Sequence, residues 1–234
     1  MPFPLPLPSF IHVLEQHWPF ISPLAGCKLV SARFDPASSS EQDMRRYGLQ
    51  PTGNSRKRQS EFLAGRICAA RALSSSQLPG RDAVSGQPLW PKGWCGSITH
   101  SHGQAVAIVA STLDWKSLGL DIERRIEAGR ALRLRSTLLT AHEQEWLEGL
   151  DQQTAANRLG LIFSAKESLY KALNPLTGVY FGFQDAQVTE YDETGRLSLQ
   201  LLRDLSDEYR YGMEFPCLWT PFAHGVLTLA YLAA

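Results

Sequence analysis

The segment Phe163-Ser-Ala-Lys-Glu-Ser-Leu-Tyr-Lys171 limits what this chain can fold into more than any other stretch. Apolar residues in and around it recur at helical spacing and form one stripe: Ile162, Ala165, Leu169, Ala172 and Leu173. A stripe of this period predicts an amphipathic helix that packs on a core through one side. Glu167 and Lys171 lie four residues apart, so they are neighbours on the opposite side. Taken alone, they are either an ordinary exposed ion pair, worth a few tenths of a kcal/mol, or part of a functional site.

A second segment, Leu118-Gly-Leu-Asp-Ile-Glu123, alternates strictly between apolar and other residues. In a strand, Gly119, Asp121 and Glu123 therefore share one face, and the two carboxylates stand about 6–7 Å apart along the backbone. Like charges this close repel each other unless they are solvated or bind a cation. A set of oxygen ligands made of Asp121, Glu123 and a third carboxylate suits Mg²⁺. The alternative is an edge strand that carries charges against aggregation. Gly119 leaves the backbone open to close approach.

Together with Gly96-Ser-Ile-Thr-His-Ser101, these segments resemble the Sfp-type and enterobactin-synthase-type 4′-phosphopantetheinyl transferases. That family has, in order, a Ser-x-(Ser/Thr)-His strand end, a Gly-(Ile/Val)-Asp-x-Glu strand and a (Trp/Phe)-(Ser/x)-x-Lys-Glu-(Ser/Ala)-x-x-Lys helix. All three motifs occur here in the same order, at residues 97–100, 119–123 and 163–171. Residues 61–70 also resemble the enterobactin-type branch. Each motif is weak by itself, whereas the ordered set is specific.

The resemblance implies an α+β fold of two similar α/β halves related by a pseudo-twofold axis, with the cofactor between them. We expect the halves at residues 1–117 and 118–234. A short internal echo agrees with this division, because Ser101-His-Gly and Ala223-His-Gly each precede an apolar strand. Local patterns predict three further elements: a helix at residues 58–73, a capping box at residues 140–143 that opens a helix, and a hairpin at residues 188–201.

The resemblance also implies a reaction. The family transfers the 4′-phosphopantetheine arm of coenzyme A to a serine of apo acyl carrier and peptidyl carrier proteins, and releases 3′,5′-ADP. The reaction depends on Mg²⁺, with coenzyme A as co-substrate. The carriers serve fatty acid, siderophore or nonribosomal peptide synthesis, and the sequence does not distinguish among them. The two-half architecture resembles relatives that work as monomers.

The resemblance assigns roles to individual residues. Asp121, Glu123 and Glu167 are expected to hold Mg²⁺, and Glu167 is also the candidate general base. Lys171 is expected to stabilise charge that develops on the leaving phosphate. Contacts to coenzyme A are expected from seven residues: Arg58, Arg66, Ser97, Thr99, His100, Lys166 and Lys171. Among these, Arg58 and Arg66 are our choices for the 3′-phosphate, while Lys166 lies on the flank of its helix and reaches either phosphate or solvent.

The net charge of zero conceals a split between the halves. Residues 1–117 carry 12 Lys and Arg against 7 Asp and Glu, and residues 118–234 carry 11 against 16. Seven cations cluster around one carboxylate, Glu61: Arg45, Arg46, Arg56, Lys57, Arg58, Arg66 and Arg71. Such a cluster either binds phosphates or forms a solvated helix face. A neutral chain lacks the electrostatic footprint of nucleic-acid binding, so no nucleic-acid partner is expected.

Other patterns exclude several classes of protein. The four cysteines, at 27, 68, 95 and 217, have no paired spacing, so a zinc knuckle is not expected. Scattered cysteines fit a reducing compartment, and we expect the protein in the cytoplasm. The start of the chain lacks the basic region and continuous apolar run of a signal peptide. No apolar stretch reaches membrane-spanning length, so no membrane partner is expected.

Two rival functions remain open. His100 and His102, if they share a strand face, could form a metal-dependent hydrolase site with Asp121. A non-catalytic carrier-binding relative would keep the fold but lack Asp121, Glu167 or Lys171, and all three are present. The chain departs from the family at Gly86-Gln-Pro88, where many relatives have Gly-Lys-Pro. A phosphate contact from that lysine is therefore not expected.

Overall fold

A computed structural model describes residues 6–49 and 55–234, so residues 1–5 of the proline-rich start and residues 50–54 lie outside the description. The chain divides into two compact units. Leu24–Asp114 and the chain before Pro19 form the first unit, whereas Pro19–Pro23 and Trp115–Ala234 form the second. The division predicted at 117/118 falls inside strand β7 (Trp115–Arg124). Both units combine helices with antiparallel strands, which confirms the α+β class.

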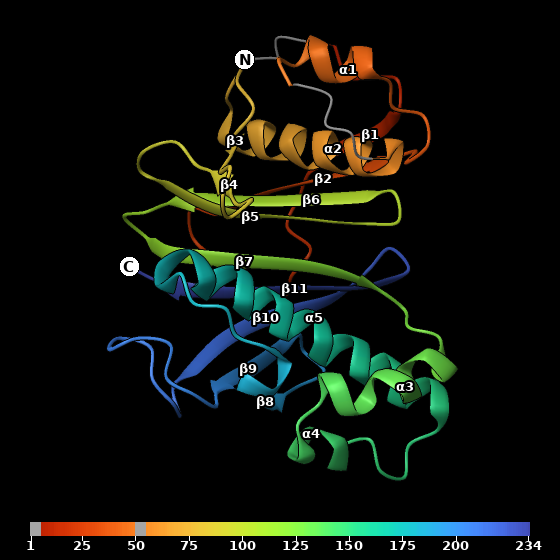
Figure 1. Ribbon diagram of the computed structural model, residues 1–234, viewed down its shortest axis with the longest axis vertical. Helices are drawn as coiled ribbons and strands as arrows, with labels where there is room; N and C mark the ends of the chain where they lie inside the picture. Colours follow the sequence, from red (N-terminus) through yellow and green to blue (C-terminus); the bar gives the residue numbers. More distant parts are fainter. Residues whose placement is uncertain (1–5, 50–54) are drawn as a thin grey trace. The chain divides into compact units, whose positions relative to one another are not determined.

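The first unit is an antiparallel sheet with one long helix on it (Figure 1). In sheet order, its strands are β1 (Ile11–Gln16), β2 (Lys28–Phe34), β6 (Gln104–Ser111) and β5 (Trp94–Ser101). The helices are α1 (Glu41–Arg46) and α2 (Arg56–Leu73), and a small hairpin pairs β3 (Gly80–Arg81) with β4 (Pro88–Leu89). Helix α2 packs on β6, β2 and β5, so its buried side meets the middle of the sheet.

Helix α2 confirms the helix predicted at residues 58–73 and begins two residues earlier. Ser55 caps its start, because the Ser55 side chain accepts a hydrogen bond from the backbone N–H of Arg58. Its last turn ends at Ser74 in the left-handed conformation. At Gly65 the helix approaches β5 closely: a Cβ there would lie 2.6 Å from Cγ2 of Ile98. This contact sets the distance between the side chains of α2 and those of β5.

The second unit is a five-stranded antiparallel sheet covered on one face by the longest helix of the unit (Figure 1). In sheet order, its strands are β7, β11 (Gly225–Ala233), β10 (Glu214–Phe222), β9 (Arg196–Leu201) and β8 (Ala186–Tyr191). Its helices are α3 (Ala128–Leu138), α4 (Ala141–Glu145), α5 (Gln152–Thr177) and the short 3₁₀ turn η1 (Phe183–Asp185). Helix α5 packs mainly on β7 and β11.

The helices and strands of this unit form where the sequence patterns predicted them. Asp151 caps the start of α5 by accepting hydrogen bonds from two backbone N–H groups, and Gly178 ends the helix in the left-handed conformation. All five residues of the predicted stripe are buried. The capping box of Thr140 and Glu143 opens α4, and β8 and β9 form the predicted hairpin. The opposite side of α5 is less exposed than expected, because Ser164, Lys166 and Ser168 are buried as well.

Gly119 brings the backbone of β7 against α5. A Cβ at this position would lie 1.9 Å from the carbonyl oxygen of Ser168 and 2.5 Å from the backbone nitrogen of Ala172. The hydroxyl of Ser117 donates a hydrogen bond of 2.7 Å to the carbonyl of Ala172. This confirms the close approach expected at Gly119, and the partner that approaches is the helix. Asp121 is the next residue of β7 on the same face, so its side chain also points at α5 and contacts the side chains there.

We expect Gly119→Ala to destabilise the second unit by about 3 kcal/mol or more, because neither neighbouring atom belongs to a flexible side chain. Gly160→Ala is the matched control on α5 itself: its Cβ would meet Ile126 at 3.8 Å, an ordinary contact. The control should be neutral or slightly stabilising, because alanine favours a helix over glycine. Urea unfolding of both variants measures the difference. Equal stabilities would contradict the assignment of Gly119 as the closest contact between strand and helix.

Candidate functional site

Strand β7 and helix α5 bring the predicted acidic and basic residues together. Asp121 is 7% exposed. One of its carboxylate oxygens accepts a hydrogen bond of 2.6 Å from Nζ of Lys171, and the other accepts one of 2.9 Å from the hydroxyl of Ser164. The same Nζ donates to the carbonyl of Leu120 at 3.1 Å. Lys171 therefore reaches across to the strand, and its ion pair is with Asp121, although the sequence places it next to Glu167.

Two further carboxylates lie in the field of Asp121. Burial, together with the charge of Asp121 and a smaller contribution from Glu167, raises the pKa of Glu123 to about 7. Burial also raises the pKa of Glu167, again with a contribution from Asp121, while Lys171 opposes the shift. The three carboxylates thus act on one another, as the sequence predicted for Asp121 and Glu123 on one strand face. Their mutual repulsion favours any ligand that brings positive charge.

This donor set fits a hard cation. Within residues 6–49 and 55–234, no group of three or more His, Cys, Asp or Glu side chains is arranged to hold a metal ion. Mg²⁺ does not require such a cage, because it keeps several waters and binds through one or two carboxylates together with substrate phosphates. Burial is the main cause of the raised pKa values of Glu123 and Glu167, and the charges of the neighbouring carboxylates add a repulsion that a cation would relieve. Asp121, Glu123 and Glu167 are thus oxygen donors of the type that Mg²⁺ takes, and their binding of Mg²⁺ stays a prediction.

The histidine pair of the rival hydrolase is not arranged as expected. His100 lies on β5, but His102 lies in the turn that follows, with φ of 46°. The expectation that both imidazoles share a strand face is therefore wrong. A set of carboxylates without histidine or cysteine also suits a hard cation better than zinc, whose sites in proteins usually include nitrogen or sulfur ligands.

The first unit has a cavity of about 620 Å³ between α2, β5 and the β3–β4 hairpin. Three arginines line it, one of them at a position that the sequence analysis did not select: Arg58, Arg66 and Arg81. His100 and Glu61 also line it, with Nδ1 of His100 3.7 Å from a carboxylate oxygen of Glu61. The apolar part of the wall includes Phe62 and Ile98. Of the seven clustered cations, Arg58 and Arg66 thus face a cavity, whereas Arg45 pairs with Glu41 on exposed α1.

Arg66 has the strongest requirement for an anion. Its side chain belongs to a residue only 4% exposed, and its Nε has no hydrogen-bond partner among the described residues. Burial, with a smaller contribution from the charge of Arg81, lowers the pKa of Arg66 to about 10. The guanidinium carbon lies 4.8 Å from the ring centre of Phe62. A buried cation with an unused donor, beside a second cation, is stabilised by a bound anion such as a phosphate.

Arg81 supplies the cation that the sequence analysis missed. Gly86, across the hairpin, has φ of 74°, and a Cβ there would lie 3.0 Å from Nη2 of Arg81. Gly86, which the family's Gly-Lys-Pro pattern also has, therefore leaves room for the guanidinium of Arg81, and the departure at Gln87 is separate from it. The glycine was a usable signal, but only the pairing of β3 with β4 reveals which side chain fills the space.

Ser97 and Thr99, two of the predicted coenzyme A contacts, do not face the cavity of the first unit. Ser97 and Thr99 are buried at 5% and 4% exposure. They alternate along β5 with Ile98 and His100, so they lie on the other face of the strand and do not line this cavity. Their role toward coenzyme A stays a prediction.

Lys166 is buried and its ammonium group is taken up by groups of the second unit, which corrects the expectation that it reaches a phosphate or solvent. It is 3% exposed. Its Nζ donates to a carboxylate oxygen of Glu143 at 2.6 Å, to the carbonyl of Phe183 at 2.7 Å and to the carbonyl of Leu138 at 2.9 Å. These three acceptors use all the donors of an ammonium group. Lys166 therefore ties α5 to α4, η1 and the end of α3.

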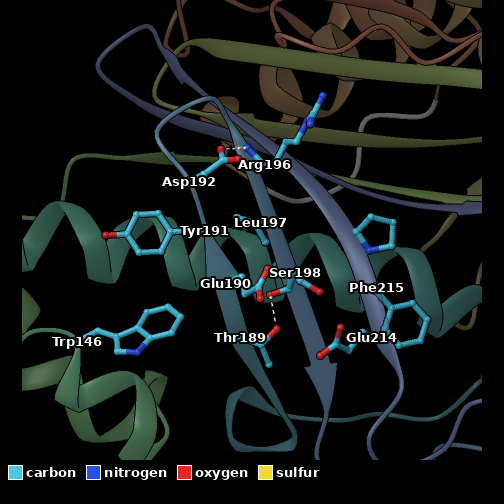
Figure 2. A pocket seen from close by; sticks show the side chains of 11 residues that line it. Trp146, Thr189, Glu190, Tyr191, Asp192, Arg196, Leu197, Ser198, Glu214 and Phe215 are labelled. Atoms are coloured by element: carbon cyan, nitrogen blue, oxygen red, sulfur yellow. Dashed lines mark hydrogen bonds between the residues drawn. The ribbon is translucent and has the colours of Figure 1, made fainter.

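A larger cavity of about 740 Å³ in the second unit does not contain the predicted residues (Figure 2). Aromatic side chains form part of its wall, and the rings of Trp146 and Tyr191 are 5.7 Å apart. Its charged lining is mainly acidic: Glu190, Asp192 and Glu214 face Arg196 alone among the lining residues. A polyphosphate is repelled by such a lining, so this cavity is not a candidate for coenzyme A.

In the part of the chain that the structure describes, no helix is both long enough and apolar enough to cross a bilayer.

Comparisons with known proteins agree with the motifs. Residues 52–110 match the model of the 4′-phosphopantetheinyl transferase N-terminal domain, and residues 117–224 match that of the 4′-phosphopantetheinyl transferase superfamily. Enterobactin synthase component D of Salmonella typhi is 35% identical over 199 residues, which cover 81% of this chain and 79% of that protein. The protein of the same name from Escherichia coli K12 is 37% identical over 73% of this chain and 82% of its own length. The 4′-phosphopantetheinyl transferase Npt of Nocardia iowensis is 37% identical over 59% and 62%.

The ion pair between Lys166 and Glu143 predicts a large effect on stability. We expect Lys166→Ala to lower the free energy of unfolding by about 3–5 kcal/mol, because it leaves a buried carboxylate without its partner. The double variant Lys166→Met, Glu143→Gln should recover much of this loss, because neither charge then remains buried and the amide oxygen can still accept a hydrogen bond from the backbone N–H of Thr140 or Val188. Urea unfolding measures both effects. The pairing would be contradicted if each single variant lost little stability and the loss in the double variant equalled the sum of the two single losses.

Proposed function

The chain belongs to the 4′-phosphopantetheinyl transferase superfamily, and from this we propose its reaction and the residues that perform it. It transfers the 4′-phosphopantetheine arm of coenzyme A to a serine of apo carrier proteins and releases 3′,5′-ADP. The observation that carries the assignment of the reacting centre is the ion pair of Lys171 with Asp121, in the field of Glu123 and Glu167. We propose that this group of residues is the reacting centre and that Mg²⁺ binds there.

The side chains have distinct tasks in this proposal. Asp121, Glu123 and Glu167 would hold Mg²⁺, which when bound neutralises the pyrophosphate and orients it for in-line displacement. Glu167 accepts the proton of the attacking serine hydroxyl; its raised pKa makes it a better base than an ordinary surface carboxylate. Lys171, whose side chain is 28% exposed, supplies positive charge next to the leaving phosphate.

We propose that the cavity of the first unit binds the 3′-phosphate of coenzyme A. Arg66 and Arg58 were the sequence-based choices, and Arg81 joins them because it lines the same cavity. A phosphate monoester carries enough negative charge to stabilise several guanidinium groups at once, and it offers acceptors to the unused Nε of Arg66. His100 lines the same cavity and is a further candidate contact.

The names of the relatives favour a class of carrier. Several are components of enterobactin synthase, so we propose peptidyl carriers of siderophore and nonribosomal peptide synthesis as the first substrates to test. Carriers of fatty acid synthesis, the monomeric state and the cytoplasmic location stay predictions. The alternative hypothesis, a non-catalytic carrier-binding relative, loses support because Asp121, Glu167 and Lys171 are all present. Asp121 and Lys171 are also in contact.

The reaction is tested by mass spectrometry of apo acyl and peptidyl carrier proteins incubated with the protein, coenzyme A and Mg²⁺. A gain of one phosphopantetheine by a carrier is the expected result. EDTA should stop the gain, and Mg²⁺ or Mn²⁺, but not Zn²⁺, should restore it. If no carrier gains this mass, or if zinc alone restores it, the proposed function or the proposed metal is wrong.

Glu167→Gln should lower the turnover number by about a hundredfold or more while the protein stays folded, because the amide keeps the shape but neither accepts the proton nor holds a cation as well. Circular dichroism checks the fold, and carrier modification at saturating substrates gives the rate. Glu148→Gln, which changes an exposed carboxylate between α4 and α5, is the control and should leave the rate unchanged. Turnover of Glu167→Gln within a few-fold of wild type would remove Glu167 from the mechanism.

Arg66→Ala should weaken the binding of coenzyme A by about 1.5–3 kcal/mol, the usual scale for a charged hydrogen bond. It should barely change the binding of 3′-dephospho-coenzyme A, which lacks the phosphate, so the two ligands together isolate the contact. Arg71→Ala is the control, since Arg71 is an exposed residue of the same helix and does not line the cavity. Calorimetric titration gives the affinities. An equal loss for both ligands would assign Arg66 to the fold instead of the phosphate.

A further inference from the structure

Three buried hydroxyl groups form a row behind the carboxylate of Asp121: those of Ser164, Thr228 and Ser168. The hydroxyl of Ser164 donates to one oxygen of Asp121 at 2.9 Å. The same hydroxyl lies 2.9 Å from that of Thr228, which lies 2.7 Å from that of Ser168. Each of these three hydroxyl-bearing residues is 0% exposed, so the row is buried from solvent. We call it the hydroxyl chain.

Three elements of the second unit meet at the hydroxyl chain. Thr228 lies on β11 directly opposite Asp121 of β7, so both side chains stand on the same face of the sheet. Helix α5 covers that face and carries Ser164 and Ser168 one turn apart (Figure 1). Within residues 226–230 of β11, Thr228 is the one residue that is not apolar. A buried hydroxyl costs free energy unless it finds partners, and α5 supplies them.

The hydrogen bonds of the chain run toward Asp121. The carboxylate of Asp121 is paired with an ammonium group and only accepts, so the single hydrogen of the Ser164 hydroxyl goes to it. The bond between Ser164 and Thr228 is then donated by Thr228. Ser168 donates toward Thr228, whose hydroxyl and carbonyl oxygens lie 2.7 and 3.0 Å from its own oxygen. Bonds aligned head to tail polarise one another, so the carboxylate meets a stronger donor than a single serine.

The hydroxyl chain and Lys171 hold the two oxygens of Asp121 separately. Nζ of Lys171 bonds to one oxygen at 2.6 Å, and Ser164 bonds to the other. The side chain of Lys171 is 28% exposed, and the proposed reaction requires it to supply charge to a phosphate as well. The hydroxyl chain is buried and uncharged, so the substrate does not compete for it. It therefore keeps the carboxylate in one orientation while Lys171 acts on the substrate.

We propose that Ser164 and Thr228 are positioning residues for the cation of the proposed reacting centre, because through the hydroxyl chain they fix the orientation of the Asp121 carboxylate. This inference rests on the proposed function. Neither side chain touches the reacting atoms, and each acts through Asp121. Loss of a hydrogen bond behind a metal ligand typically lowers the affinity for the metal by about ten- to a hundredfold. A hydroxyl chain that only packs α5 on the sheet would have no such effect.

Manganese binding measures the effect without turnover, since carboxylate sites that suit Mg²⁺ also suit Mn²⁺. Electron paramagnetic resonance detects free Mn²⁺, so a titration of the protein with coenzyme A present gives the affinity. We expect Ser164→Ala to weaken Mn²⁺ binding about tenfold or more, and Thr228→Val several-fold. Thr228→Ser keeps the hydroxyl and should stay within about twofold of wild type. Asp121→Ala gives the loss that follows when the ligand itself is removed.

Ser117→Ala is the matched control. Ser117 is a buried residue of β7 on the same face as Asp121, and its hydroxyl also bonds to α5, at the carbonyl of Ala172. The control removes one buried hydrogen bond between strand and helix, as Ser164→Ala does, but not one that leads to Asp121. Urea unfolding should show a loss of stability in both variants, whereas only Ser164→Ala should weaken Mn²⁺ binding.

Steady-state rates give a second measurement. The Mg²⁺ concentration for half-maximal carrier modification should rise in Ser164→Ala and Thr228→Val by about the same factors as the dissociation constant for Mn²⁺. The turnover number at saturating Mg²⁺ should stay within about threefold of wild type, because excess metal fills the weakened site by mass action.

Four results would overturn the proposal. Unchanged Mn²⁺ affinity in Ser164→Ala and Thr228→Val would assign the hydroxyl chain to packing alone. An equal loss of affinity in Ser117→Ala would trace the effect to the separation of strand and helix. A loss in Thr228→Ser equal to that in Thr228→Val would trace it to the methyl group of the threonine. Absence of Mn²⁺ binding by wild type would remove the cation that the chain is proposed to serve.

Failure of the proposed function is distinguishable from failure of this inference. Mn²⁺ binding is measured without a carrier protein. If wild type modifies no carrier but binds Mn²⁺ in a manner that depends on Ser164, the positioning role stands and the proposed reaction is wrong. If carriers are modified while Ser164→Ala leaves Mn²⁺ binding unchanged, the reaction stands and the positioning role is wrong.

Discussion

The contact between the backbone of β7 and helix α5 at Gly119 is the constraint on which the proposed reacting centre depends. No side chain separates strand from helix there, so the backbones lie closer than any other residue would permit. Asp121, two residues on, is consequently within 2.6 Å of Nζ of Lys171 and 2.9 Å of the Ser164 hydroxyl. A larger separation would break both hydrogen bonds. The glycine of the motif thus contributes as much to the site as its carboxylates do, although it carries no functional group.

Buried hydroxyl groups extend the same arrangement behind the carboxylate. The hydroxyl of Ser164 also lies 2.9 Å from that of Thr228 on β11, which in turn lies 2.7 Å from that of Ser168. Hydroxyl groups can donate and accept at once, so the chain satisfies each buried oxygen. Asp121 is therefore held from α5 and, through Ser164, from the neighbouring strand. A carboxylate fixed in this way loses little further freedom when a cation binds to it.

The sequence predicted those parts of the structure that depend on local spacing. Helical period, strict alternation and capping residues located α2, α5, β7 and the capping box of Thr140, and the glycine at 119 indicated a close approach. The sequence did not reveal contacts that depend on which elements meet. Lys166 was expected at a phosphate or in solvent, but α3, α4 and η1 surround it with acceptors. Arg81 was overlooked because its proximity to Gly86 exists only once the hairpin forms.

Lys166 and Lys171 show why one motif holds two different kinds of lysine. Five residues at 100° each place the two side chains about 140° apart around α5. One side of the helix faces the carbonyls of Leu138 and Phe183 and the carboxylate of Glu143, which together replace the water around an ammonium group. The other side faces β7, where Lys171 keeps a partly exposed side chain and pairs with a carboxylate of the proposed centre. Burial, which residue type and spacing do not encode, therefore decides that Lys166 stabilises the fold and leaves Lys171 accessible for chemistry.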